Sequence, residues 1–243
     1  MNIVAVTRAH YGCDYIRAVV QSTEGFAEKH AVLYTPVPTF RHSTPVSNPD
    51  SEAELHSIAS AAGGARLEWL TGLPVEVDTA FKQFPSADII LELDADEVIE
   101  PLLCRDIIER YSRGELTARS YRLPLIHFWR SFGYVCRDGN HPPRLYLPHS
   151  SGQDGVYYPS GAGHILHFGY ARRIVDMEYK IALSAHRDEF RKTWWDDTFM
   201  AFPDRLTDLH PISPDFWNAE AYDKTRLPDC LREHPYYQLD KIE

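Results

Sequence analysis

Asp94, Asp96 and Glu97 place three carboxylates within four consecutive positions of the chain. Carboxylates this close repel one another unless a cation or hydrogen-bond donors offset their charge. Mg²⁺ and Mn²⁺ are hard ions that prefer carboxylate and phosphate oxygens, so two aspartates and a diphosphate make a natural site for them. An extended segment would point Asp94 and Asp96 to the same side. The spacing therefore favours a metal-assisted reaction in which the ion stabilises a departing diphosphate.

The apolar run at residues 89–93 directly precedes these acids and is typical of a buried strand. Ligands of open α/β sheets gather beyond the carboxyl ends of the strands. A second interpretation stays open, because Asp96, Glu97 and Glu100 also precede Pro101, a residue suited to the first turn of a helix. Acids at that place would interact favourably with the helix dipole without any ligand.

The elements that must position these acids alternate along the front half of the chain. Strands are predicted at residues 2–7, 31–34, 66–70 and 89–93, and helices at residues 15–22, 52–62, 78–84 and 101–111. The opening strand, helix and strand are typical of a right-handed βαβ unit. After Gly114, short strands are predicted at residues 119–129, 134–137, 144–147 and 164–168.

A helix is predicted from Ala171 towards Phe190, and the proline-rich and aromatic C-terminal part is expected to be a surface tail instead of a second core. This order predicts the α/β class, with a mostly parallel central sheet flanked by helices and a smaller mixed region of strands and helices. A chain of 243 residues fits one elaborated domain.

Composition excludes several classes of function and location. The net charge of −10 and the pI near 5.6 argue against tight non-specific binding of nucleic acid. The four cysteines form no CxxC pair and are expected to be reduced thiols of a cytoplasmic protein. The N-terminus lacks the features of a signal peptide, and no apolar run approaches the length of a membrane span.

Residues 86–97, with the sequence SADIILELDADE, resemble the "gDwil.lDaDE" segment of family-2-like glycosyltransferases with the GT-A fold. The segment Arg144-Leu145-Tyr146 is similar to the "RLF" segment of the lipopolysaccharide-core glucosyltransferase branch. His167-Phe168-Gly169-Tyr170, followed by Lys180, looks like the "H.gY…K" segment of that branch. The resemblance covers roughly residues 1–190.

This resemblance implies a nucleoside-diphosphate-sugar donor, with a UDP-sugar preferred, a Mn²⁺ or Mg²⁺ ion, and transfer of a hexosyl or pentosyl group to an unknown acceptor. It implies that residues 1–114 bind the nucleotide-sugar and that residues 115–243 bind the acceptor. Asp94, Asp96 and His167 would hold the metal. The implied donor contacts are Thr7, Arg8, Asp94 and Lys180, and the expected acceptor contacts are Arg144 and Trp195.

An inverting transferase needs a base, usually a carboxylate, that takes the proton of the acceptor hydroxyl. Asp154 is the first candidate by position, in the loop between Arg144 and His167, and Asp138 is the second. Each could instead be a plain turn residue. Two rival functions also stay open: a nucleotidyltransferase with paired aspartates, and a non-catalytic binding module whose acids only cap a helix.

Overall fold

The computed structural model describes residues 1–38, 44–73, 77–137, 139, 141–159, 161–213 and 217–243. The chain divides into two compact units. The first unit comprises Met1–Val37, Asp50–Leu125 and Asn140–Leu166, and the second comprises Pro38–Pro49, Ile126–Gly139 and His167–Glu243. This division differs from the predicted boundary at residue 114, because strands that follow Gly114 in the chain belong to the sheet of the first unit.

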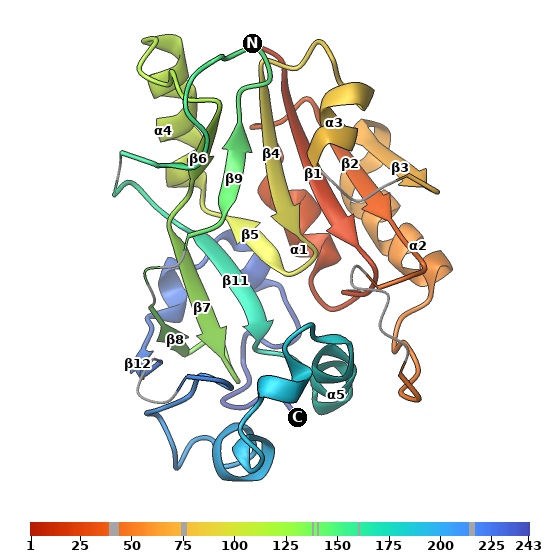
Figure 1. Ribbon diagram of the computed structural model, residues 1–243, viewed down its shortest axis with the longest axis vertical. Helices are drawn as coiled ribbons and strands as arrows, with labels where there is room; N and C mark the ends of the chain where they lie inside the picture. Colours follow the sequence, from red (N-terminus) through yellow and green to blue (C-terminus); the bar gives the residue numbers. More distant parts are fainter. Residues whose placement is uncertain (39–43, 74–76, 138, 140, 160, 214–216) are drawn as a thin grey trace. The chain divides into compact units, whose positions relative to one another are not determined.

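The first unit contains a seven-stranded sheet with the order β10-β6-β9-β4-β1-β2-β3 (Figure 1). The strands are β1 (Ile3–Ala9), β2 (Lys29–Tyr34), β3 (Leu67–Thr71), β4 (Ile89–Asp94), β6 (Ser120–Arg122), β9 (Pro143–Tyr146) and β10 (Val156–Tyr157). Strand β1 pairs in parallel with both β2 and β4, whereas β9 runs antiparallel between β4 and β6. The prediction of a mostly parallel central sheet is confirmed.

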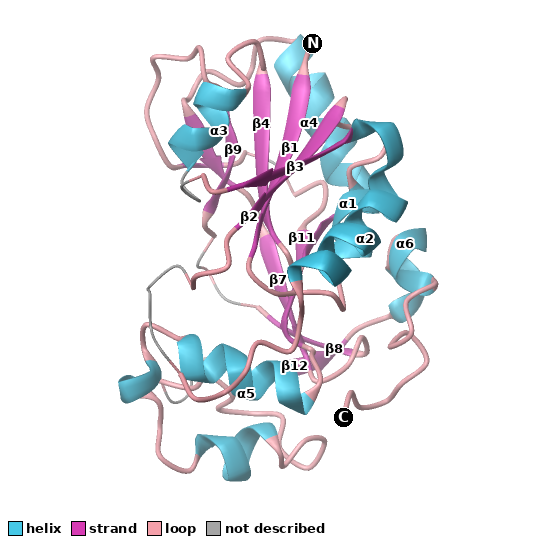
Figure 2. Cartoon of the chain, turned by 90° about the vertical axis from the view of Figure 1, so that its right-hand side faces the viewer, coloured by secondary structure: helices cyan, strands magenta, loops and turns pink. Residues whose placement is uncertain are grey.

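Helices cover both faces of this sheet, as Figure 2 shows. They are α1 (Ile16–Ser22), α2 (Glu52–Gly63), α3 (Val77–Gln83) and α4 (Pro101–Ser112), with a short 3₁₀ turn at Gly64–Arg66. Ile16 of α1 and Leu55 of α2 pack with Val32 on one face, and Ala80 of α3 packs with Val6 on the other. Because successive strand residues point to opposite faces, the apolar strands supply both cores.

His30 is a fully buried histidine within the first of these cores. Its Nε2 lies 2.9 Å from the Thr7 Oγ1, and its Nδ1 lies 2.8 Å from the Thr23 Oγ1. Burial, together with the charge of Arg66, lowers the pKa of His30 to about 3. The imidazole therefore stays neutral in the folded chain at pH values where it is protonated in the unfolded chain.

We expect His30 to make the fold acid-sensitive. Between its ordinary pKa of about 6.5 and the folded value, the unfolded chain binds the extra proton, so the free energy of unfolding falls as pH falls, by up to about 1.4 kcal/mol per pH unit. Denaturant titrations between pH 7 and 4 should show that the free energy of unfolding depends less steeply on pH in the His30→Gln variant than in wild type. The exposed His56→Gln variant is the control, and equal slopes for all three proteins would contradict the assignment.

A second sheet has the order β12-β8-β7-β11-β5. Its strands are β5 (Glu97–Ile99), β7 (Leu125–Trp129), β8 (Tyr134–Cys136), β11 (Ile165–Tyr170) and β12 (Ala219–Ala221). The predicted strand at 119–129 is thus two strands in different sheets, and Pro124 separates them because it has no N–H to continue a ladder.

The second unit has an apolar core of its own, which corrects the expected surface tail. Trp129 of β7 packs with Met177 of α5 (Ile174–Leu183) and with Trp217 near the C-terminus. Ile242 is fully buried, and its N–H donates to the Arg130 carbonyl at 2.9 Å. The remaining helical segments are Arg187–Glu189, a π-helix at Trp195–Phe199, Lys224–Arg226 and α6 (Asp229–Arg232). The aromatic residues of the C-terminal part therefore form a core instead of a tail.

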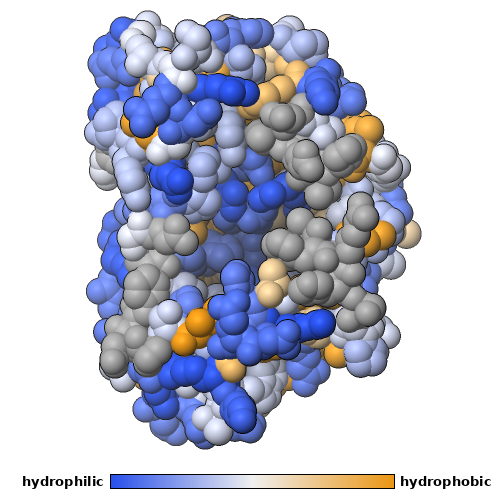
Figure 3. Space-filling model, viewed as in Figure 1, coloured by the Kyte–Doolittle hydropathy of each residue, from blue (hydrophilic) through white to orange (hydrophobic). Residues whose placement is uncertain are grey.

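Hydrophilic residues cover most of the face seen in Figure 3, and apolar residues occur there only in small groups. All four cysteines are free thiols, and Cys104 and Cys136 are buried. Among the residues that the structure describes, no helix combines the length and apolar character that crossing a membrane requires.

Candidate functional site

The acidic segment lies where the strand order of the first sheet reverses. Within the sheet, the chain passes from β1 to β2 and β3 on one side of β1, and then returns to β4 on the other side of β1. Arg8, near the end of β1, and Asp94, the last residue of β4, are direct partners in the parallel register. Crevices at such reversal points, beyond the carboxyl ends of the strands, are the usual ligand sites of open α/β sheets.

The strand registers bring the charged side chains to one face. Asp94 and Glu92 alternate with apolar residues along β4, so they point to the same side as Ile90. Tyr146 of β9 is the partner of Ile90, and Arg144 lies two positions earlier on β9. Two strands distant in sequence therefore supply guanidinium groups to the acids of β4.

Arg8 and Arg144 form a network of ion pairs with these acids. Arg8 contacts the Asp94 Oδ1 at 2.9 Å and the Glu92 Oε1 at 2.8 Å. Arg144 contacts the Asp94 Oδ2 at 2.6 Å and holds Glu97 through two bonds of 2.7 and 2.8 Å. Burial opposes the charge on both arginines, but the adjacent carboxylates outweigh it and raise the pKa of each guanidinium.

Glu97 bears on one of the two interpretations of the acidic segment, the one in which the acids cap a helix. It lies on β5 and is 1% exposed, and it accepts the Asp94 N–H at 3.0 Å in addition to the bonds from Arg144. Helix α4 begins only at Pro101 and has no acidic residue in its first turn. Glu97 therefore organises the end of β4, and the helix-cap interpretation is wrong for this residue.

The charges of this site fit a hard divalent cation. The three carboxylates of the network, those of Glu92, Asp94 and Glu97, outnumber its two guanidiniums and leave a formal charge of −1. Asp96, buried at the turn between Asp94 and Glu97, adds a further acid to this segment of the chain. The two carboxylate oxygens of Asp94 accept from different arginines, Oδ1 from Arg8 and Oδ2 from Arg144. Among the described residues no group of three protein ligands is assembled. Carboxylate oxygens are the protein ligands that hard ions such as Mg²⁺ and Mn²⁺ prefer, so it is the charge of the site, and not an assembled set of ligands, that fits such an ion.

A close backbone approach at Gly12 fixes the turn that carries Asp96. Gly12 has a φ of +133°, and a Cβ built there would lie 2.9 Å from the Ala95 Cβ and 3.2 Å from the Ala95 carbonyl oxygen. The Asp50 Oδ2 accepts the Gly12 N–H at 2.6 Å and the Cys13 N–H at 2.8 Å. The loop after β1 and the turn after β4 are thus packed directly against each other.

Replacement of Gly12 by alanine should destabilise the first unit and disturb the acidic turn. We expect a loss of about 2–5 kcal/mol in the free energy of unfolding, from backbone strain and overpacking together. Gly25→Ala is the matched control, because Gly25 also has a positive φ but nothing lies near its added Cβ, so about 1–2 kcal/mol is expected. Equal losses in urea titrations of the two variants would show that the Ala95 contact contributes nothing.

The structure changes the roles expected of two residues. Thr7 is fully buried with its hydroxyl on His30, so its side chain is not available to a nucleotide. It points into the core because it alternates with Arg8 along β1. Arg144 is 7% exposed and committed to Glu97 and Asp94, so it positions carboxylates and does not present its side chain to an acceptor.

The position of Asp154 argues against its predicted role as a base. Its Oδ1 accepts a bond from the Ser120 hydroxyl at 3.1 Å, and its side chain is 66% exposed. Ser120 pairs with Tyr146, which pairs with Ile90 at the beginning of β4. Four residues of strand, or roughly 13 Å, separate that level of the sheet from Asp94. Asp138 lies outside the described residues, and its role stays a prediction.

His167, Lys180 and Trp195 belong to the second unit. The His167 Nδ1 lies 2.8 Å from the His127 Nδ1, and the Lys180 ammonium lies 5.3 Å from the centre of the Tyr170 ring. A Cβ at Gly169 would come within 2.5 Å of the His167 Nε2 and 2.7 Å of the Lys180 Nζ, so only glycine leaves these two groups their positions. Trp195 begins the π-helix.

Two site residues escaped sequence reasoning. Glu92 was included only as part of an apolar strand, although an acid inside such a run is a signal in itself. Asp50 lies in a segment that was predicted only to be a loop, and its bonds to the Gly12 and Cys13 N–H groups could not be read from spacing.

No protein-family model matches the chain, and no curated protein matches it. Solved structures that resemble it in part include S. aureus TarS 1-349, with a TM-score of 0.43 and 9% identity over 70% of this chain and 61% of that chain. The same fragment in complex with UDP has a TM-score of 0.37 and 12% identity, over 59% of this chain and 38% of that chain. Glucosyl-3-phosphoglycerate synthase from Mycobacterium tuberculosis in complex with Mg²⁺ and UDP has a TM-score of 0.35 and 18% identity, over 53% of this chain and 44% of that chain. The chain spans less than two thirds of the length of each.

Proposed function

We propose that this chain is a glycosyltransferase that uses a nucleoside-diphosphate-sugar, with a UDP-sugar as the preferred donor, and Mn²⁺ or Mg²⁺. The observation that carries the proposal is the network of Arg8, Glu92, Asp94, Arg144 and Glu97 at the strand-order reversal between β1 and β4. An acidic site with a net negative charge does not attract a diphosphate by itself. A divalent cation held by Asp94 and Asp96 would supply the positive charge that makes the site suited to a diphosphate.

The residues of the network divide the work of binding. Asp94 and Asp96 would hold the ion, and Arg144 and Glu97 would keep Asp94 in place through their buried bonds. Arg8, whose side chain is 33% exposed, would border the nucleotide. The roles of His167 as a metal ligand and of Lys180 as a donor contact stay predictions, since both residues belong to the second unit. The bound ion would supply a positive charge that stabilises the departing diphosphate.

In the proposed reaction, an acceptor oxygen forms a bond to the anomeric carbon of the sugar. The bond from that carbon to the diphosphate oxygen breaks, and its electron pair stays on the diphosphate. The proton of the acceptor hydroxyl passes to a base, for which Asp138 remains the candidate, or to the departing diphosphate if the configuration is retained. Arg8, which pairs with Glu92 and Asp94, would counter the charge of these carboxylates when the donor is bound.

A thermal-shift experiment with the purified chain tests the proposal. UDP together with Mn²⁺ should raise the melting temperature, whereas either alone should raise it much less, because a ligand stabilises a protein only by binding its folded state. Release of UDP from a panel of UDP-, GDP- and dTDP-sugars then identifies the donor. If no nucleotide gives a metal-dependent shift, the proposal fails. Release of pyrophosphate from a nucleoside triphosphate and a sugar phosphate would instead favour a nucleotidyltransferase.

A further inference from the structure

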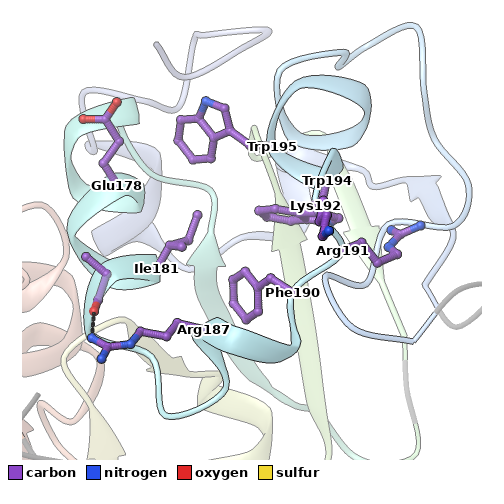
Figure 4. A pocket seen from close by; sticks show the side chains of 9 residues that line it. Glu178, Ile181, Arg187, Phe190, Arg191, Lys192, Trp194 and Trp195 are labelled. Atoms are coloured by element: carbon purple, nitrogen blue, oxygen red, sulfur yellow. Dashed lines mark hydrogen bonds between the residues drawn. The ribbon is translucent and has the colours of Figure 1, made fainter.

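The second unit contains a pocket of about 490 Å³ that the proposed donor site does not use. Helix α5 forms one wall with Glu178, Ile181 and Ala182, and the segment that follows this helix forms the others (Figure 4). Its size lies within the range of small-molecule sites. The lining residues of the second wall are Arg187, Phe190, Arg191, Lys192, Trp194 and Trp195.

The aromatic part of this pocket is held rigidly. Trp194 is 2% exposed, and its indole N–H donates to the Leu209 carbonyl at 2.8 Å. The ring of Trp195 stacks on Phe199 with centroids 5.0 Å apart, and the Met200 N–H donates to the Trp195 carbonyl across a π-helical turn. π-Helical turns are rare in proteins, and those that occur are often found at functional sites. A half-buried ring that is already fixed can bind a flat ligand face with little loss of entropy.

The charges around the pocket select the kind of ligand. The guanidinium of Arg191 is engaged by Asp208 at 2.7 Å and is therefore part of the framework. Arg187 and Lys192 are exposed, and within the described part of the chain neither forms an ion pair. Glu178 adds one exposed carboxylate on α5. These three side chains leave a net positive charge on the rim, in a chain whose formal charge is −10.

We propose that this pocket binds a sugar that carries a phosphate or carboxylate group. Arg187 and Lys192 pair with the anionic group, since a guanidinium binds either anion through two parallel bonds. The rings of Phe190 and Trp195 cover the apolar face of the sugar, and Glu178 accepts bonds from its hydroxyls. A purely apolar ligand would leave these charged groups desolvated, which is costly.

Direct binding measurements test this proposal by calorimetry and tryptophan fluorescence. The probes are glucose 6-phosphate, glucuronic acid, methyl glucoside and inorganic phosphate. We expect one of the two anionic sugars to bind at least tenfold more tightly than both methyl glucoside and phosphate, and the tighter of the two identifies the anionic group. Arg187→Gln combined with Lys192→Gln should weaken that binding about tenfold or more, and Trp195→Ala should weaken it while reducing the fluorescence change.

Lys82→Gln combined with Arg105→Gln provides the matched control, because both residues are exposed, belong to α3 and α4 of the first unit, and do not line this pocket. This control removes the same number of charges and should bind as wild type does. Equal binding of neutral and anionic sugars, or inorganic phosphate binding as tightly as the anionic sugars, would overturn the proposal. So would an unchanged affinity in the Arg187 and Lys192 variant.

The donor assays separate the two proposals. The Arg187 and Lys192 variant should keep the thermal shift with UDP and Mn²⁺ and the hydrolysis of the donor. If the wild-type chain shows no nucleotide shift but still binds an anionic sugar, the glycosyltransferase function fails and the pocket stands. If nucleotide binding is present and no sugar binds, the reverse holds.

Discussion

Asp96→Asn is expected to remove the Mn²⁺-dependent stabilisation by UDP and to lower kcat by about 10²–10³-fold. The substitution keeps the size of the side chain but removes the charge of a proposed metal ligand. A bound ion would supply several kcal/mol of transition-state stabilisation, and about 1.4 kcal/mol corresponds to tenfold in rate. Asp96 is buried at the turn after β4, so the isosteric amide is preferred to alanine. Thermal shift and donor hydrolysis are both measured over a range of Mn²⁺ concentrations.

The exposed Asp204→Asn variant serves as the control for this experiment, because it makes the same chemical change in the second unit. It should retain the shift and the rate. If the Asp96→Asn protein kept a normal Mn²⁺-dependent thermal shift with UDP, the acidic segment would not be part of the proposed donor site, whatever the activity of the chain.

Arg144→Met is expected to cost about 3–5 kcal/mol of stability, the usual effect of removing one partner of a buried ion pair. The cost arises because Glu97, which is 1% exposed, would keep its charge in the protein interior without its two bonds from Arg144. Urea titrations measure the change in the free energy of unfolding, with the same dependence on urea concentration fitted for variant and wild type. We also expect weaker nucleotide binding, because Asp94 loses its 2.6 Å contact.

The double variant Arg144→Met with Glu97→Met tests whether the loss of stability comes from leaving the charge of Glu97 without a partner. Replacing both charges by apolar side chains of similar size should recover most of the lost stability, while nucleotide binding should stay weak. Arg144→Lys should fall between the extremes, because an ammonium keeps the charge but cannot form the two parallel bonds of a guanidinium. A single variant that loses less than about 1 kcal/mol would place this pair among the weak surface ion pairs.

The sequence predicted the local elements well, because their signals are local. The runs that became β1, α1, β2 and β4 are bounded by turn residues, and each predicted range differs from the observed one by at most a few residues. The acids after β4 were also found in this way, since a carboxylate group next to a buried strand is visible in a single window of the sequence. Strand β5, which is only three residues long, has no comparable signal.

The partners of those acids were decided only by the tertiary structure. Arg8 is 86 positions from Asp94 and Arg144 is 50 positions from it, and only the sheet registers bring the three together. Registers depend on how whole strands pack, which no local pattern specifies. For the same reason the sequence indicated that Thr7 and Arg8 end a strand, but only the packed sheet decided that the hydroxyl faces His30 in the core while the guanidinium faces the acids.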